Sequence, residues 1–373
     1  MILNIFRKFV NYWSPTSFMD KSLLTLGKAS FSPGGLKVIQ KLQQHGYQAF
    51  FVGGCVRDLL LGQTPKDFDI VTDARPRQIT AIFSNAIIIG KRFTLVHVRW
   101  KDELIEVATF RKHTSAADAS KDPEILKHDN TYGTLQDDLI RRDFTLNALY
   151  YDPIAHRLID ECGGLGDIYH KVVRTIGVDE HRFTEDPVRM IRAVRYAAKL
   201  NLSLSSGITA AIRKKSLLLA HVPKARLYEE YLKCFNHCYA DRVFDLMSSQ
   251  KLIRHLVPKT LAQPELTKTI RALLKHLIQI DAVKDQIPAL ITFCFIVPTW
   301  LKNSSQQNLT HFEEHIYSFN SLVSIPRQVD LAIKEFLLGI YPSAEEQHRY
   351  RLLPKMKIFK HSCQSLFKLA QKF

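Results

Sequence analysis

The apolar pattern of the chain changes near residue 186, and this change limits the possible folds more than any other feature. Between residues 34 and 110, short runs of β-branched and aromatic residues alternate with stretches of helical spacing. This mixture is typical of a small domain that combines strands with helices. From Asp186 onward, apolar residues recur at intervals of three and four, which predicts helices. We therefore expect an α+β fold, in which a small mixed sheet is followed by an all-helical remainder.

Changes in pattern also divide the chain into four expected segments. An N-terminal extension covers residues 1–33, a mixed-sheet domain covers 34–177, and two helical segments cover 178–245 and 246–373. The stretch 113–132 is polar and has no sustained apolar period. We expect a mobile loop there, near a functional site.

The charge of the chain narrows the class of partner. Its 373 residues include 52 Lys and Arg against 36 Asp and Glu, a formal net charge of +16, which favours a polyanion such as a nucleic acid. Six scattered cysteines without paired CxxC units favour a reduced, cytoplasmic protein over a zinc protein. The most apolar late run, residues 287–301, is shorter than the ~20 residues of a membrane span and contains two prolines. We expect no membrane segment and no signal peptide.

Two aspartates, Asp67 and Asp69, stand two residues apart in the run 66–71. If this run is a strand, its two-residue period places both carboxylates on one face. Neighbouring carboxylates repel each other unless cations lie between them, so we expect metal ligands here. Glu106, which interrupts an apolar strand, is the candidate third ligand. Two Mg²⁺ ions, or Mn²⁺ in their place, would suit a nucleotidyl transfer that releases pyrophosphate.

Gly53, Gly54 and Arg57 form a candidate phosphate-binding turn. The two glycines separate an apolar strand from a predicted helix, where backbone amides can hold phosphate oxygens. Arg57 would add a charged donor to this group. The alternative is a tight turn without a ligand.

The segment 141–147 gathers two cations, a carboxylate and an amide. Arg142 can pair with a phosphate, while Asp143 and Asn147 can hold a ribose hydroxyl or order the metal-binding carboxylates. A surface salt-bridge cluster is the alternative interpretation.

A helix that begins near Pro187 carries a candidate base-reading pair. Asp186 and Arg189 are three residues apart and share a helical face. An acceptor beside a donor matches the edge of adenine or cytosine, but not that of guanine or uracil. Arg192, one turn farther along, is expected to join this nucleotide site. Asp186 could instead serve only as the N-cap of the helix.

Taken together, these segments resemble the class II nucleotidyltransferases, which comprise bacterial poly(A) polymerases and tRNA CCA-adding enzymes. The resemblance covers about residues 35–240 and rests on residues 53–58 with 67–69, and on 141–145, 160–167, 185–189 and 224–229. It implies a nucleotidyltransferase head with a mixed sheet, followed by a helical neck, body and tail that bind RNA. It implies the following roles: metal ligands Asp67 and Asp69, a further catalytic carboxylate Asp143, and base contacts Asp186 and Arg189. Glu106 and Asp143 remain alternatives for the third metal-binding carboxylate.

Two further likenesses favour one branch of the family. Residues 89–98 resemble the stretch that marks poly(A) polymerases, and residues 287–301 and 325–338 resemble the helical body of those enzymes. The resemblance thus implies a template-independent poly(A) polymerase that uses ATP to extend RNA 3′ ends, as a monomer with RNA-decay proteins as partners. Two alternatives stay open: a tRNA CCA-adding enzyme that uses CTP and ATP, and a non-catalytic RNA-binding protein on the same fold.

Overall fold

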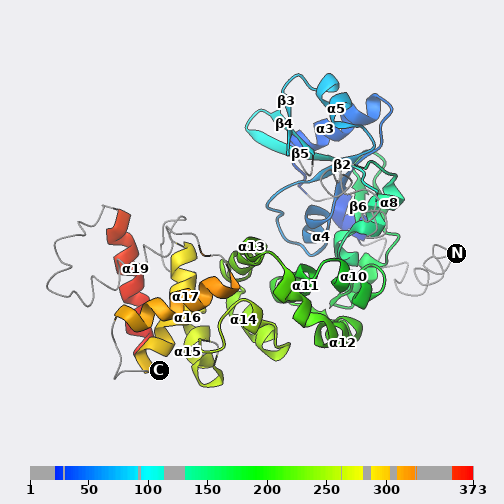
Figure 1. Ribbon diagram of the computed structural model, residues 1–373. Coiled ribbons are helices and arrows are strands. Elements are labelled where there is room, and N and C mark those ends of the chain that lie inside the picture. The colour runs from blue at the N-terminus through cyan, green and yellow to red at the C-terminus, as the bar shows by residue number, and fades with distance from the viewer. Residues whose placement is uncertain are drawn as a thin grey trace. The chain divides into compact units, whose positions relative to one another are not determined.

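The structure, a computed structural model, describes residues 22–27, 30–90, 94–112, 131–261, 263–279, 287–302, 309–323, 325 and 355–372. These residues form two compact units, whose elements are labelled in Figure 1. The first unit contains the chain up to Glu185 together with Ser203–Ser205, and the second contains Asp186–Leu202 and the chain from Ser206 onward. Most of the N-terminal extension, of the expected loop 113–132 and of the segment 325–338 lies outside the described residues.

Within the first unit, the described residues form a seven-stranded sheet in the order β3-β4-β5-β2-β1-β6-β7. The strands are β1 (Ala49–Val52), β2 (Ile70–Thr72), β3 (Ala86–Ile89), β4 (Leu95–Trp100), β5 (Glu103–Thr109), β6 (Tyr150–Asp152) and β7 (Arg157–Ile159). β2 pairs with β5 in parallel, and the other neighbouring pairs are antiparallel. The predicted mixed sheet is therefore confirmed.

Helices connect and cover these strands. They are α3 (Pro33–Gln44), α4 (Gly54–Leu60), α5 (Pro76–Ile82), α8 (Leu135–Arg141), the 3₁₀ turn η1 (Thr145–Asn147), α9 (Gly164–Tyr169) and α10 (Asp179–Glu185). The N-cap of α3 is Ser32, whose side-chain oxygen accepts the Gly35 N–H at 2.8 Å. A short parallel ladder joins β8 (Val172–Val173) to β9 (Ser203–Leu204).

Alternation along β4 and β5 produces one buried face and one open face. α3 and α5 contact these strands and cover the buried face. The side chains of that face are Val96, Val98, Ile105 and Val107, each at most 3% exposed. His97 and Glu106 lie opposite each other in the ladder and point to the other face, which carries the candidate site.

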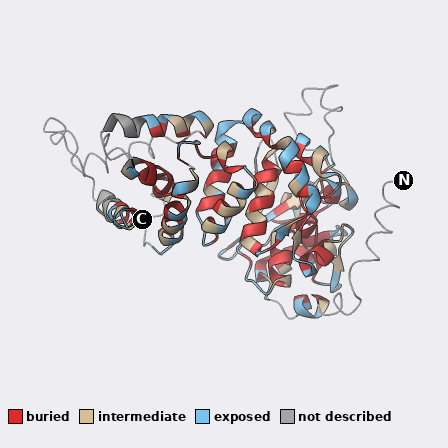
Figure 2. Ribbon diagram, turned by 90° about the horizontal axis from the view of Figure 1, so that it is seen from below, coloured by how far each residue is buried: buried red, intermediate tan, exposed pale blue. Residues whose placement is uncertain are grey.

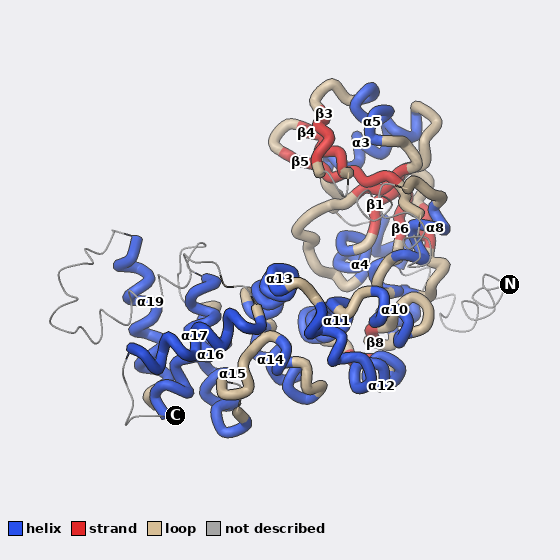
Figure 3. The backbone as a smooth tube through the Cα atoms, viewed as in Figure 1, coloured by secondary structure: helices blue, strands red, loops and turns tan. Residues whose placement is uncertain are grey.

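The described residues of the second unit are helical and contain no strand, as the sequence predicted (Figure 3). Its helices are α11 (Val188–Leu200), α12 (Ser206–Lys215), η2 (Ser216–His221), α13 (Lys224–Phe235), α14 (Ala240–Ser249), η3 (Ile253–His255), η4 (Pro264–Leu266), α15 (Thr267–Leu277), α16 (Ile287–Lys302), α17 (Leu309–Leu322) and α19 (Lys355–Ala370). Most carry both buried and exposed residues (Figure 2), as amphipathic helices do.

The core of the second unit is aromatic. The Phe295 ring centroid lies 5.1 Å from that of Phe235 and 6.2 Å from those of Tyr231 and Phe319. Phe295 belongs to α16, which is apolar along nearly its whole length and buried among its neighbours. In the part of the chain that the structure describes, no helix has both the length and the hydropathy needed to cross a membrane.

Candidate active site

The two aspartates lie just before β2 and not within it, so the expected strand over residues 66–71 is wrong for residues 66–69. Residues 67–69 have no regular structure, because β5 pairs with this segment only from Ile70 onward. The Phe68 ring packs 5.7 Å from that of Phe51 and 6.1 Å from that of Phe31, measured between centroids. This packing anchors the segment that carries Asp67 and Asp69.

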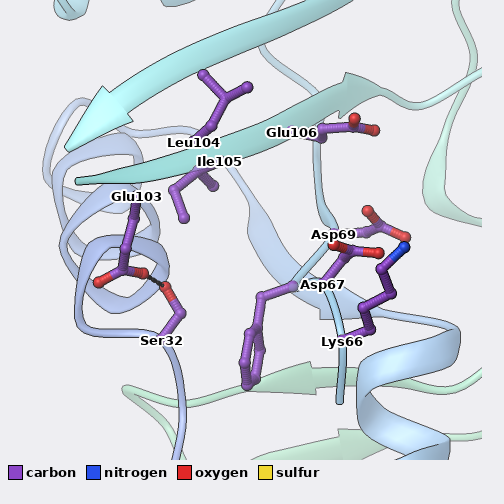
Figure 4. Close-up of a pocket in the computed structure, with 9 residues that line it drawn as sticks. Ser32, Lys66, Asp67, Asp69, Glu103, Leu104, Ile105 and Glu106 are labelled. Carbon is purple, nitrogen blue, oxygen red and sulfur yellow. Dashed lines mark hydrogen bonds between the residues drawn. The ribbon is translucent and has the colours of Figure 1, made fainter. Parts of the chain in front are cut away.

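Asp67, Asp69 and Glu106 nevertheless come together, since all three line a pocket of about 530 Å³ in the first unit. Figure 4 shows Glu106 projecting from β5 on the side of Asp69, with the Lys66 side chain beside the two aspartates. The lining residues are Ser32, Lys66, Asp67, Phe68, Asp69, Glu103, Leu104, Ile105 and Glu106. The sequence grouped the three carboxylates correctly although it misassigned the backbone that carries two of them.

The carboxylates of this pocket influence one another electrostatically. Burial raises the pKa of Asp69, the charges of Glu106 and Asp67 raise this pKa further, and Arg142 lowers it. A cation between the carboxylates would relieve this repulsion. Oxygen ligands of this type suit hard divalent cations such as Mg²⁺.

The three side chains do not yet surround one point. Among the described residues, no three His, Cys, Asp or Glu side chains are already arranged around a single ion position. The Glu106 side chain is 51% exposed, so it can rotate without displacing packed neighbours. The donor set therefore fits a divalent cation in chemistry and location, provided that side chains turn toward it.

Asp143, the alternative third metal-binding carboxylate, does not line this pocket. Its Oδ1 accepts the Phe144 N–H at 2.9 Å and the Asn147 side-chain amide at 3.0 Å. Asn147 Oδ1 in turn accepts a hydrogen bond from the guanidinium of Arg57. The geometry thus favours Glu106 as the third carboxylate and makes Asp143 the end of a hydrogen-bonded chain that starts at Arg57.

Gly53 and Arg57 are placed differently from the predicted phosphate contacts. The Gly53 N–H donates to Leu149 O at 3.0 Å, so this amide is already used. Gly53 has φ +70° and is the N-cap of α4, which explains the preference for glycine. Arg57 is only 3% exposed and bonds to Asp58 at 2.6 and 2.8 Å as well as to Asn147. Both residues order the turn, since their donors point into the protein.

Arg142 is also engaged inside the first unit. Its guanidinium donates to Asp138 Oδ2 at 2.9 and 3.1 Å and to the Tyr150 hydroxyl at 2.8 Å. A further bond reaches the main-chain oxygen of Asn147 at 3.3 Å. Its positive charge still reaches Asp69 and lowers the pKa of that carboxyl.

The predicted base-reading residues Asp186, Arg189 and Arg192 belong to the second unit. Asp186 lies one residue before Pro187, which is the N-cap of α11, so the N-cap interpretation of Asp186 is wrong. Its Oδ1 nevertheless accepts the Val188 N–H at 3.2 Å. The other carboxylate oxygen of Asp186 accepts a hydrogen bond from Arg226 at 2.7 Å. Arg189 and Arg192 lie within α11.

Buried Glu230 of α13 forms ion pairs with two arginines of α11. Its carboxylate lies 3.4 Å from Arg195 and 4.0 Å from Arg192. Sequence reasoning assigned no role to Glu230 or Arg226, because their partners, which are two arginines of α11 and Asp186 before it, lie about forty residues away in the chain. Only the packing of α13 against α11 brings these charges together.

Residues 49–174 match the family model described as the poly A polymerase head domain. Residues 201–263 match a second model, described as "Probable RNA and SrmB- binding site of polymerase A". The poly(A) polymerase I of Salmonella typhi is 41% identical over 239 residues, which are 62% of this chain and 51% of that protein. The CCA-adding enzyme of Geobacillus stearothermophilus is 39% identical over 221 residues, 59% of this chain and 54% of that protein.

The chain spans about half the length of the curated relatives it matches. Among solved structures, the CCA-adding enzyme of Bacillus stearothermophilus in complex with CTP shares 28% identity and a TM-score of 0.62, with 92% of this chain and 82% of that chain covered. The two family models, the relatives and the shared fold agree with one another. Over residues 49–174 and 201–263 these findings confirm the resemblance to the class II nucleotidyltransferases, and the relatives include both poly(A) polymerases and CCA-adding enzymes.

Proposed function

We propose that the chain is a template-independent poly(A) polymerase that transfers AMP from ATP to RNA 3′ ends and releases pyrophosphate. The observation that carries this proposal is the pocket in which Asp67, Asp69 and Glu106 meet, on a unit that matches a poly A polymerase head domain. The relative with the highest identity reported above is also a poly(A) polymerase.

The carboxylates would hold the metal ions. When bound, two Mg²⁺ ions would activate the RNA 3′ hydroxyl and stabilise the charge that develops on the triphosphate. Asp67 and Asp69 are fixed by the packing of Phe68, and Glu106 is presented by β5. We assign metal binding to these three residues and catalysis to Asp67, Asp69 and Asp143.

Each unit carries residues that we propose for nucleotide binding. In the first unit, Arg57, Asn147 and Asp143 form a chain of hydrogen bonds, and Arg142 bonds to the main chain of Asn147. Gly53 and Gly54 form the turn at the start of α4. In the second unit, we propose that Asp186 and Arg189 contact the base of ATP and that Arg192 supports them. The donor and acceptor pattern of this pair favours adenine or cytosine over guanine or uracil.

The same proposal assigns functions to the expected segments. Residues 34–177 would form the catalytic head, 178–245 the neck that binds nucleotide and RNA, and 246–373 an RNA-binding body and tail. The net charge of +16 supports contact with the RNA backbone. All six cysteines are free thiols, which supports a reducing compartment such as the cytoplasm.

A single primer-extension experiment tests the proposed activity. A labelled short RNA and a tRNA that lacks its CCA end are each incubated with Mg²⁺ and ATP, CTP, or both. Long ladders with ATP alone on either RNA are the expected result. A stop after three nucleotides, seen only on the tRNA and only with both nucleotides, would assign CCA addition instead. Binding of RNA without extension under any metal condition would favour the non-catalytic alternative.

A further inference from the structure

A row of three side chains crosses the open face of β3, β4 and β5. The strand register pairs Ile87 with His97 and His97 with Glu106, and paired residues in a ladder point to the same face. His97 Nε2 lies 3.4 Å from Glu106 Oε1. His97 is therefore the immediate neighbour of the carboxylate that reaches the pocket from β5.

The ring nitrogen of His97 is buried without a hydrogen bond. Nε2 has almost no contact with solvent, and no described residue forms a hydrogen bond with it. A buried polar atom without a partner is unfavourable and rare in folded proteins. The nearby Glu106 oxygen is the acceptor that a small rotation of either side chain would supply.

Glu106 needs such a partner more than the two aspartates do. The segment of Asp67 and Asp69 is anchored by Phe68, whereas the Glu106 side chain is longer and 51% exposed. Within the described residues, His97 is the one basic side chain with a nitrogen within 4.0 Å of the Glu106 carboxylate, at 3.4 Å. A carboxylate that ligates a metal is commonly oriented by a second hydrogen-bonding group behind it.

We propose that His97 is a positioning residue for the metal-binding carboxylate of Glu106. The Nε2 N–H of His97 donates to Glu106 Oε1 and leaves Oε2 to turn toward the cation. His97 itself touches neither the metal nor the nucleotide. This inference rests on the proposed function, because it takes Glu106 as a metal ligand.

The test measures metal binding directly, without turnover. Mn²⁺ is titrated into the full chain in the absence of nucleotide, and free Mn²⁺ is counted by electron paramagnetic resonance. His97→Leu removes the donor at similar volume and is expected to weaken Mn²⁺ binding by about 10- to 100-fold. His97→Gln places an amide N–H near the position of Nε2 and is expected to restore most of the affinity. His97→Asn, whose amide reaches only the position of Nδ1, is expected not to restore it.

Two controls separate positioning from a general loss of structure. Ile87→Ala removes the other neighbour of His97 in the row and should leave Mn²⁺ affinity unchanged, since Ile87 is 67% exposed and distant from Glu106 in the register. In a Glu106→Gln background, adding His97→Leu should lower Mn²⁺ affinity by less than about 2-fold. A residue that acts only by positioning the Glu106 carboxylate has no effect once that carboxylate is removed.

The outcomes also distinguish this inference from the proposed function. If Glu106→Gln weakens Mn²⁺ binding and His97→Leu does not, the inference is wrong while the metal site stands. If His97→Leu lowers affinity equally with and without Glu106, His97 acts by another route and the inference is also wrong. If the wild-type chain does not bind Mn²⁺, or if Glu106→Gln leaves its Mn²⁺ affinity unchanged, the metal site itself is misassigned and the inference is wrong with it.

Discussion

The substitution Asn147→Ala tests the chain of hydrogen bonds that joins the two sequence segments of the candidate site. Asn147 is 7% exposed and connects Arg57, which is 3% exposed, to Asp143. Each of its two bonds involves a charged partner, and such bonds contribute about 1.5–3 kcal/mol. Arg57 keeps its ion pair with Asp58, so we take the lower end for both bonds. The free energy of unfolding should then fall by about 3 kcal/mol.

Thermal unfolding followed by circular dichroism measures this loss. For a unit of this size, a loss of about 3 kcal/mol corresponds to a fall in Tm of about 6–12 °C. Asn85→Ala is the matched control, since exposed Asn85 loses only one bond to the Arg99 main chain and should cost about 1 kcal/mol or less. Extension activity of the Asn147 variant should also fall at 20 °C, where it remains folded. A fall in Tm below about 2 °C would refute the view that these buried bonds stabilise the site.

Three further substitutions probe the remaining features. Asp69→Asn should lower extension more than about 100-fold, because loss of groups behind a metal ligand alone costs 10- to 100-fold. Its free energy of unfolding should be unchanged or higher, because burial and the charges of Glu106 and Asp67, which raise the Asp69 pKa, then no longer disfavour a charged group. Urea unfolding checks this with Asp73→Asn as the control. Burial, together with the charge of Arg254, lowers the pKa of His255 to about 4 from its ordinary 6.5. Between these two pH values the unfolded state binds more protons than the folded state, so the free energy of unfolding falls as the pH drops from 6.5 to about 4. His255→Gln should therefore flatten the decline in urea midpoint between pH 7 and pH 5. Arg226→Ala should raise the KM for ATP several-fold by releasing Asp186, yet it should change Tm by less than about 3 °C since the pair is exposed.

Much of the fold could be predicted because local pattern and final structure agree. The aromatic and β-branched runs at Ala49–Val52 and Leu95–Trp100 are strands, and the segment of helical spacing after Asp186 forms α11. The exception is the segment of Asp67 and Asp69. Its residue types alternate as in a strand, but membership of a sheet depends on a partner, and β5 offers one only from Ile70 onward.

The sequence could predict which residues belong to the candidate site better than it could predict their contacts. The two-residue spacing of Asp67 and Asp69 and the place of Glu106 within an apolar run identified these three carboxylates. The role of Arg57 could not be predicted, since a sequence reveals that a donor exists but not which acceptor it meets. Its acceptor on Asn147 lies 90 residues away in the chain. The Arg57 guanidinium, which the sequence suggested for phosphate binding, donates instead to Asn147 and Asp58.

The position of Glu106 depends on the hairpin that joins β4 to β5. Trp100 pairs with Glu103, so the loop between them has only two residues, and Lys101 adopts φ +53° within it. Such tight turns fix the register of the strands that follow. A slip of one residue would turn Glu106 toward the buried face and move an apolar neighbour to the open one. The place of Glu106 and its contact with His97 thus follow from a turn three residues away, so the metal binding that we propose for the pocket depends on the pairing of two strands and not on Glu106 alone.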